Sequence, residues 1–444
     1  MQAVLERSLT VIMSHKKSMN KKRSLSVLFS LISLLVFVQS CTNTETDPSQ
    51  TENGTPTETT TAPTETNPAT ETTPAEVAEE PTPEPTPEPV NPLAKFDKEK
   101  SAKLTDTSKI MAGFEVDGSS TLADVQNSNA WINNAGYFDN KWPTLENQQL
   151  SKVRKWSQAE LKTINESNPS IFYPFSGADF LYGYSLFPNA KEYLLIGLEP
   201  VGTVPDFQNM SAGERAQKLE IITQSLYAIL EYSFFRTLDM EVDLSNQGVL
   251  PILLVFMART NNQILDVQYI GVDANAQMKV VEPGSTESKG LVPGVKISLL
   301  PEGESEPKTL YYFSSDISND GLKKTPGFQK FITQYADESV TYLKAASYLM
   351  HYDSFSTIRN LILDGSKALL QDDSGMAVRF VDEAKWDRQF YGQYISPIAL
   401  FADEYQPDLR SIYQSDATIP PLDFGIGYKF YNDSNLMLAT RKSQ

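Results

Sequence analysis

Residues 42–94 restrict folding to the rest of the chain. Threonine, glutamate and proline dominate this segment, which has 11 acidic residues and no lysine, arginine or aromatic residue. Such a composition cannot bury enough apolar surface to offset the entropy lost on ordering, so we expect disorder. In polyproline II, at ~3.1 Å per residue, it would extend to roughly 160 Å. We predict a spacer over residues 41–94, the alternative being a low-complexity tract without a selected length, and one globular domain over residues 95–444.

An apolar run before the spacer predicts a secretory signal. Residues 27–38 are interrupted only by Ser30 and Ser33, and the basic residues 21–23 precede them. The run is about 12 residues long, too short for a bilayer span of roughly 20 residues, but typical of a signal h-region. We assign residues 1–40 to a signal peptide. Residues 1–18 add nothing that such a signal needs, so we hypothesise that translation starts at Met19.

The chain's only cysteine, Cys41, follows this run directly. Val38-Gln39-Ser40-Cys41 resembles a bacterial lipobox, which has an aliphatic residue at −3 and a small residue at −1. The resemblance implies a lipoprotein: diacylglycerol and a fatty acid such as palmitate on Cys41 after cleavage. Two or more acyl chains anchor a protein stably to a membrane. Thr42 stands where aspartate is the familiar inner-membrane retention residue, so we expect the outer membrane of the cell envelope in a host with two membranes. An ordinary secretory signal and an inert cysteine are the alternatives.

Composition excludes several functions for the whole chain. One cysteine cannot form an internal disulfide or a multi-thiolate site, and two histidines argue against a multi-histidine metal site. The formal net charge of −18 argues against coating nucleic acid, which needs a surplus of basic residues. We therefore predict no cofactor and no nucleic-acid partner.

Apolar periodicity predicts long helices in the body. Apolar residues at helical spacing cover residues 145–164, 326–343 and 355–370, and Pro326 can begin the second of these helices. Ser211 and Glu214 form a capping box that begins another helix.

Other apolar runs predict strands, and we expect them to form a largely antiparallel sheet. The predicted strands cover residues 193–198, 250–258, 264–272, 295–300, 310–313, 422–431 and 436–439, with a hairpin joining the second and third. Strands and helices are partly segregated, with a meander over residues 249–314. This favours an α+β fold over a doubly wound parallel fold.

Two polar residues near predicted turns and strand ends are weak catalytic candidates. Ser176 precedes Gly177 and could be an exposed nucleophile, but it lacks the spacing of a nucleophile elbow, and a tight turn explains it as well. Glu199 follows a predicted strand and could be a general base or a binding carboxylate, or a loop acid that faces solvent or caps a backbone group.

His351 is the only histidine in the body, so any histidine-dependent catalysis must use it. A relay of Ser176, His351 and Asp372 can be written, because such triads are defined in space. The adjacent acids Asp372 and Asp373 could form an acid–base pair or contribute to a hard-cation site, or they could simply end a helix.

A short acidic loop is a weak calcium candidate. Asp316, Ser318 and Asp320 match the first half of a calcium-binding loop, but Gly327 stands where the bidentate glutamate would be. An ordinary Asx-turn is the alternative. The tyrosines near the C-terminal end of the sequence suit sugar or peptide binding if exposed, and packing if buried.

Several blocks of the body resemble a family of secreted or lipid-anchored bacterial proteins with no assigned activity. The blocks are residues 175–180, 187–190, 197–202, 371–375 and 425–428. The resemblance supplies no residue roles. We therefore expect a lipid-anchored envelope protein whose tethered body binds a ligand or an envelope partner. A tethered extracytoplasmic hydrolase is the alternative, and whether the protein is an enzyme stays open.

Overall fold

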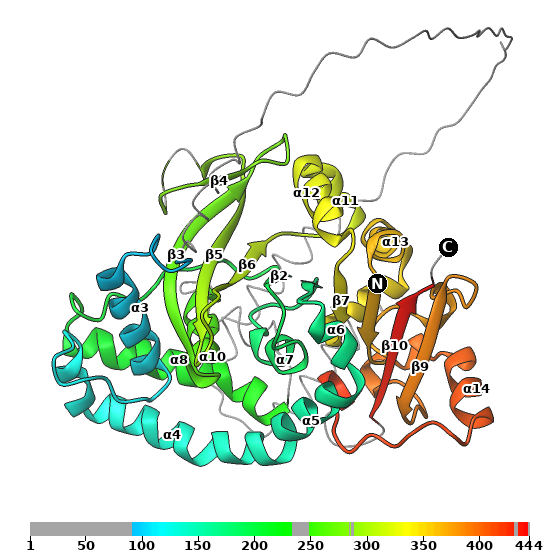
Figure 1. The fold of residues 1–444 in the computed structure, drawn as a ribbon, viewed down its shortest axis with the longest axis horizontal. Helices are drawn as coiled ribbons and strands as arrows, with labels where there is room; N and C mark the ends of the chain where they lie inside the picture. Colours follow the sequence, from blue (N-terminus) through cyan, green and yellow to red (C-terminus); the bar gives the residue numbers. More distant parts are fainter. Residues whose placement is uncertain (1–90, 233–247, 284, 286–287, 430–433, 443–444) are drawn as a thin grey trace, which may run out of the picture. The chain divides into compact units, whose positions relative to one another are not determined.

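The computed structural model describes residues 91–444 except residues 233–247, 284, 286–287, 430–433 and 443–444 (Figure 1). Asn91–Gln444 form one compact unit. The predicted signal, Cys41 and nearly all of the spacer lie outside the described residues. Within the described part of the chain, no helix is both long and apolar enough to cross a membrane.

Ten strands form one mixed sheet in the order β4-β3-β5-β6-β2-β1-β7-β8-β10-β9. The strands β6, β2, β1, β7 and β8 run parallel in the centre, and antiparallel pairs complete the sheet at both ends (Figure 1). Their bounds are β1 Ser170–Tyr173, β2 Glu192–Gly197, β3 Asn262–Val272, β4 Met278–Val280, β5 Val292–Pro301, β6 Lys308–Ser314, β7 Val340–Leu343, β8 Ala368–Gln371, β9 Trp386–Gly392 and β10 Asn435–Arg441.

Helices together with a mixed sheet agree with the predicted α+β class, but the expectation of an antiparallel sheet is wrong for its centre. The β1–β2, β6–β7 and β7–β8 connections each contain helices, which return the chain to the same edge of the sheet, so that the next strand runs parallel. The strands β7 and β8 were predicted as helix ends, because Val340, Leu343 and Leu369 continue the helical spacing of the preceding segments.

Helices cover both faces of the sheet. Along β2, Tyr193 and Leu195 pack into the core beneath α3–α10, whereas Leu194 and Ile196 pack into the core beneath α11–α14. The helices are α3 Lys98–Met111, α4 Asn129–Leu145, α5 Ser151–Glu160, α6 Lys162–Glu166, α7 Phe180–Leu186, α8 Ala212–Tyr232, α10 Leu250–Arg259, α11 Asn319–Lys324, α12 Pro326–Ala336, α13 Ser356–Gly365 and α14 Pro407–Ser415.

The segment predicted as a strand over residues 250–258 is the helix α10. Every residue from Leu250 to Ala258 is buried, so the run has no polar face and its periodicity cannot separate a buried helix from a buried strand. Pro251 lies in the first turn, where a helix tolerates proline, whereas a central strand would lose a ladder hydrogen bond there. The predicted hairpin therefore does not form, although β3 does.

Local signals set several helix starts correctly. The Ser211 amide donates to Glu214 Oε2 at 2.8 Å and the Glu214 amide to Ser211 Oγ at 3.4 Å, the predicted capping box. Pro326 begins α12. The helix predicted from residue 145 instead begins at Asn129, and a π turn over Glu146–Leu150 joins α4 to α5.

The end of the chain differs in part from the prediction. The segment predicted as a strand over residues 422–431 contains a short 3₁₀ turn, η8 (Gly427–Lys429), and its last two residues lie outside the described part. The strand predicted over residues 436–439 is β10.

Candidate functional site

The carboxyl ends of the parallel strands form the candidate site. From β1 the chain continues to β2 on one side, and β7 later pairs with the other side of β1. In open sheets of this kind, ligands bind at the carboxyl ends of the strands where the order reverses. Asp179 follows β1, Lys344 follows β7, and Asp372 and Asp373 follow β8. All four side chains are buried.

Asp179 and Lys344 form a buried ion pair at the point where the strand order reverses. Lys344 Nζ lies 2.7 Å from Asp179 Oδ2, and the two side chains are 3% and 2% exposed. Tyr173 donates its hydroxyl to the same oxygen at 2.7 Å, and Asp179 Oδ1 caps α7 by accepting from the Tyr182 amide at 3.2 Å. The Lys344 ammonium also lies 4.1 Å from the centre of the Tyr182 ring. The charges of both partners are therefore matched.

Asp373 also has several partners. The Tyr348 hydroxyl donates to Asp373 Oδ2 at 2.6 Å, and Asn435 Nδ2 donates to Asp373 Oδ1 at 2.9 Å. Lys429 Nζ lies 3.7 Å from Oδ2 and donates to the carbonyl oxygen of Ser396. These contacts join the loop after β8 to β10 and to the η8 turn that precedes β10.

Asp372 differs from these groups because one of its carboxyl oxygens has no partner. Oδ1 accepts from the amide of Ser374 at 3.0 Å and from its hydroxyl. Oδ2 is buried without a hydrogen-bond partner. Burial, and then the neighbouring Asp373, raise the pKa of Asp372 to about 7, although Ser374 and Lys344 act in the opposite direction. This carboxyl group therefore titrates near neutral pH.

His351 supports the Asp372 loop from outside. Its Nε2 donates to the carbonyl oxygen of Gly375 at 3.0 Å, and its Nδ1 lies 3.2 Å from Glu404 Oε2. Burial lowers the pKa of His351. Because neither ring nitrogen faces Ser176 or Asp372, the relay of Ser176, His351 and Asp372 does not form.

A short segment, which we call the covering segment (η7, Ala399–Glu404), lies against these groups. Phe401 stacks on Tyr348 with 4.4 Å between ring centroids, and Glu404 contacts His351. Leu400 is exposed, whereas Tyr348 is buried. The covering segment thus adjoins the ring that donates its hydroxyl to Asp373.

Ser176 continues the β1–β2 pairing and is not placed as an exposed nucleophile. Its hydroxyl accepts from the Ile196 amide at 3.1 Å and faces the carbonyl oxygens of Gly177 and Ile196 at 3.1 and 3.3 Å. The residue is 5% exposed. Its position therefore fits the turn interpretation.

Glu199 lies two residues after β2 and is buried, so it does not face solvent. Its carbonyl oxygen accepts from the Tyr312 hydroxyl at 2.7 Å. Its carboxylate packs on two glycines: a Cβ on Gly197 would lie 2.4 Å from Glu199 Oε2, and one on Gly177 would lie 3.6 Å away. The two glycines provide the space for this carboxylate.

The weak calcium candidate adopts the Asx-turn. Asp316 Oδ1 accepts from the Ser318 amide at 2.9 Å, Ser318 Oγ caps α11 by accepting from the Gly321 amide at 3.1 Å, and Asp320 lies in the first turn. In the described residues, no group of three or more histidine, cysteine, aspartate or glutamate side chains is placed to hold a metal ion.

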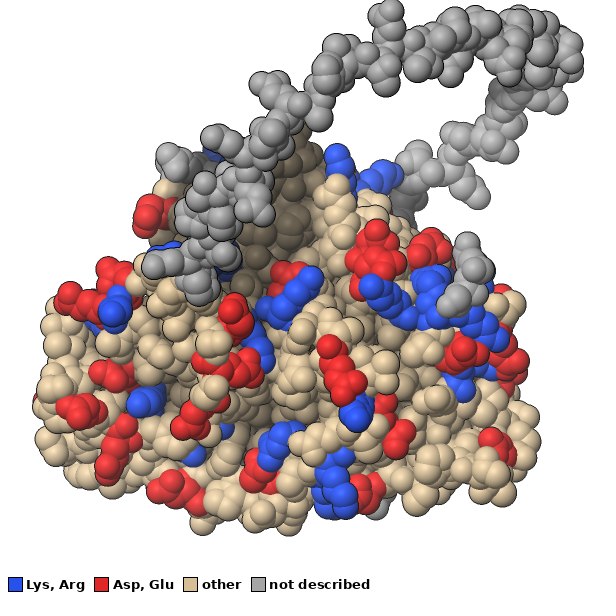
Figure 2. Space-filling view, in the orientation of Figure 1, with Lys and Arg blue, Asp and Glu red and all other residues tan. Residues whose placement is uncertain are grey.

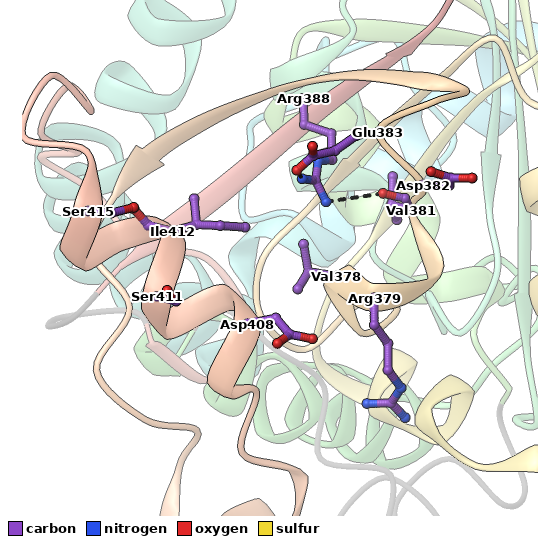
Figure 3. A pocket seen from close by; sticks show the side chains of 10 residues that line it. All are labelled: Val378, Arg379, Val381, Asp382, Glu383, Arg388, Asp408, Ser411, Ile412 and Ser415. Atoms are coloured by element: carbon purple, nitrogen blue, oxygen red, sulfur yellow. Dashed lines mark hydrogen bonds and ion pairs between the residues drawn. The ribbon is translucent and has the colours of Figure 1, made fainter.

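A separate groove of about 470 Å³ lies on the surface beside α14 (Figure 3). Val378, Val381 and Ile412 supply its apolar lining, and Arg388, which also lines it, donates to the Val381 carbonyl oxygen at 3.2 Å. Acidic and basic side chains are interspersed on the face drawn in Figure 2. None of the residues singled out from the sequence lines this groove.

Sequence reasoning found Asp372, Asp373 and His351 but missed Lys344, Lys429 and Asn435. Lys344 directly follows residues 340–343, and Asp372 follows the apolar residues 368–370 after one intervening Gln371; a polar residue at the end of such a short run is the signal that could have marked a strand end.

Comparison of the chain with family models, curated proteins and solved structures finds no match in any of the three.

Proposed function

We propose that this protein is a lipid-anchored envelope protein, held to the outer membrane through Cys41, whose body binds a ligand at the carboxyl ends of β1, β7 and β8. The observation that carries the proposal for the body is the group of buried charges at the reversal of strand order. The lipobox resemblance of residues 38–41 supports the anchor, and the composition of residues 42–94 supports a spacer.

The energetics of burial favour a functional role for this edge. Removing an ion from water costs several kcal/mol even after the protein relaxes, and apolar residues of similar volume often serve stability as well or better. Asp179, Lys344, Asp372 and Asp373 are nevertheless all buried within one edge of the sheet. Buried ionisable groups gathered at such a position, one of them Asp372 with its raised pKa, are typical of binding and catalytic sites.

A second candidate function is hydrolysis at the same edge. A carboxyl group with a pKa of about 7 beside a second carboxyl group can exchange a proton near neutral pH. Asp372 would then be the acid–base group. Ser176 does not serve this candidate as a nucleophile, because its hydroxyl is engaged with the main chain of β2.

The anchor is tested by lipid labelling. Cys41→Ser should abolish incorporation of radiolabelled fatty acid and release the protein from the membrane fraction. Ser40→Ala, which keeps a small residue at −1, is the matched control and should retain the label. Undiminished labelling of the Cys41→Ser protein would reject the anchor.

The ligand site is tested with the mature chain carrying Cys41→Ser, which removes the only cysteine and the proposed lipid. Envelope sugars, amines and short peptides are screened by thermal shift, and chromogenic esters and glycosides by hydrolysis. Asp372→Asn should lose the response to a bound compound, whereas the exposed Asp337→Asn should keep it. Binding without turnover favours the ligand-binding function, and turnover that depends on Asp372 favours the hydrolase. A bound compound that is unaffected by Asp372→Asn would refute this location.

A further inference from the structure

We infer that the ligand of this edge presents a protonated amine to Asp372. The inference rests on the proposed ligand site and specifies the chemistry of its ligand. It follows from the charges, the unpartnered oxygen and the aromatic rings of the described residues.

Negative and positive charges are unequal among the buried groups at this edge of the sheet. Three carboxyl groups, those of Asp179, Asp372 and Asp373, face two ammonium groups, those of Lys344 and Lys429. Asp179 takes the 2.7 Å contact with Lys344, and Asp373 takes Lys429 and two hydrogen-bond donors. When Asp372 is ionised, its carboxylate is therefore the excess negative charge, and its Oδ2 is the acceptor without a donor.

Several tyrosine hydroxyls interact with this carboxyl group through their charges. Asp372 interacts electrostatically with five tyrosine hydroxyls, namely those of Tyr173, Tyr342, Tyr348, Tyr413 and Tyr428. The Tyr342 hydroxyl, which can both donate and accept, is also buried without a hydrogen-bond partner. An ammonium that approaches Asp372 over the face of one of these rings would gain cation–π attraction as well.

Gly427, which has no side chain, lies beside the buried Oδ2 of Asp372. This glycine has a φ of +60°, and a Cβ there would lie 3.1 Å from Asp372 Oδ2 and 3.6 Å from Lys344 Cβ. Asp372 is 3% exposed. In this inference, a ligand reaches Asp372 only when the neighbouring η8 turn moves.

A donor suits this site better than a metal ion does. The other oxygen of Asp372 is already bonded to Ser374, and both oxygens of Asp373 have donors. A single unpartnered carboxylate oxygen does not supply the six or more oxygen ligands that calcium takes. One ammonium group restores both the missing hydrogen bond and the charge balance.

The test compares amines with alcohols of the same skeleton on the mature Cys41→Ser chain. Propylamine is compared with propanol, and glucosamine with glucose, by calorimetry at pH 7. A hydrogen bond to a charged group contributes about 1.5–3 kcal/mol, so each amine should bind at least tenfold more tightly than its alcohol. Asp372→Asn should remove this preference, and Asp337→Asn should keep it.

Proton release gives a readout that needs no substitution at Asp372. Because the pKa of Asp372 is about 7, the carboxyl group is about half protonated at pH 7, and binding of an ammonium should release about half a proton. Repeating the calorimetry in buffers of different ionisation enthalpy measures that release. The groups that face Asp372 are Asp373, Lys344 and the five tyrosines, and burial raises the pKa of each tyrosine further from neutral.

The outcomes separate the two proposals. Equal binding of amines and alcohols, lost in both cases with Asp372→Asn, would overturn the amine inference and leave the ligand site in place. Amine binding without proton release and undiminished by Asp372→Asn would overturn both. Failure of all four compounds to bind would overturn the amine inference, while a different compound that depends on Asp372 would still support the site.

Discussion

Removing the Lys344 ammonium should destabilise the body more than any exposed ion-pair substitution does. Lys344→Met keeps the length of the side chain and leaves Asp179 as a buried carboxylate with Tyr173 and the Tyr182 amide as its remaining donors. Removing one partner of a buried pair typically costs about 3–5 kcal/mol. The contact of 2.7 Å between side chains that are 3% and 2% exposed places this pair in that class.

The measurement is urea unfolding of the mature Cys41→Ser chain, followed by tryptophan fluorescence and circular dichroism. Lys162→Met is the matched control, because Lys162 pairs with Glu166 at 3.8 Å with side chains 71% and 63% exposed. It should change the unfolding free energy by less than about 0.5 kcal/mol. Asp179→Asn combined with Lys344→Met should recover most of the loss, since no unpaired charge then remains buried. A loss below about 1 kcal/mol for Lys344→Met, or no recovery in the double variant, would refute the buried pair.

Three further perturbations test the site and its surroundings. Asp372→Asn should flatten the pH dependence of stability: between the ordinary pKa of 3.8 and about 7 the folded chain holds a proton that the unfolded chain releases, so the unfolding free energy should fall as pH rises, by up to about 1.4 kcal/mol per unit. Equal slopes for wild type and variant in urea unfolding between pH 4 and pH 7 would contradict this. Gly197→Ala should lose about 1–3 kcal/mol, because the new Cβ would lie 2.4 Å from a Glu199 carboxylate oxygen and 3.0 Å from the Gly177 Cα. Gly213→Ala is its control in the same unfolding assay, because a Cβ at Gly213 would have no heavy atom within 4 Å. If Gly197→Ala were as stable as the wild type, the Glu199 carboxylate would have to move aside freely. Phe401→Ala should remove the stacking on Tyr348 and speed amide hydrogen exchange across the covering segment, measured by mass spectrometry. Unchanged exchange would mean that the ring does not hold the segment in place.

Local signals in the sequence predicted elements where one neighbourhood decides the structure. The Ser211 capping box and Pro326 act within one helical turn, and both begin helices as expected. The run at residues 250–258 was misassigned because burial on all sides removes the polar face on which periodicity depends.

The site was harder to predict because it depends on which strands are neighbours. Asp179 and Lys344 are far apart in the sequence, and only the parallel pairing of β1 with β7 brings them within 2.7 Å. With β7 interpreted as the end of a helix, Lys344 had no reason to lie near any acid. Asp372 and Asp373 were found because two adjacent acids are conspicuous, but the unpartnered Oδ2 that distinguishes Asp372 is a property of packing alone.

The position of β10 sets an order for assembly of the sheet. The strand β10 lies between β8 and β9, although both precede it in the chain. Until residue 441 has been synthesised, β9 has no partner in the sheet, and Asp373 lacks the donor that Asn435 provides. The group of buried charges at this edge of the sheet is therefore completed only after β10 docks. If the chain is exported before it folds, as the proposed anchor requires, the proposed ligand site would form only after β10 has crossed the membrane.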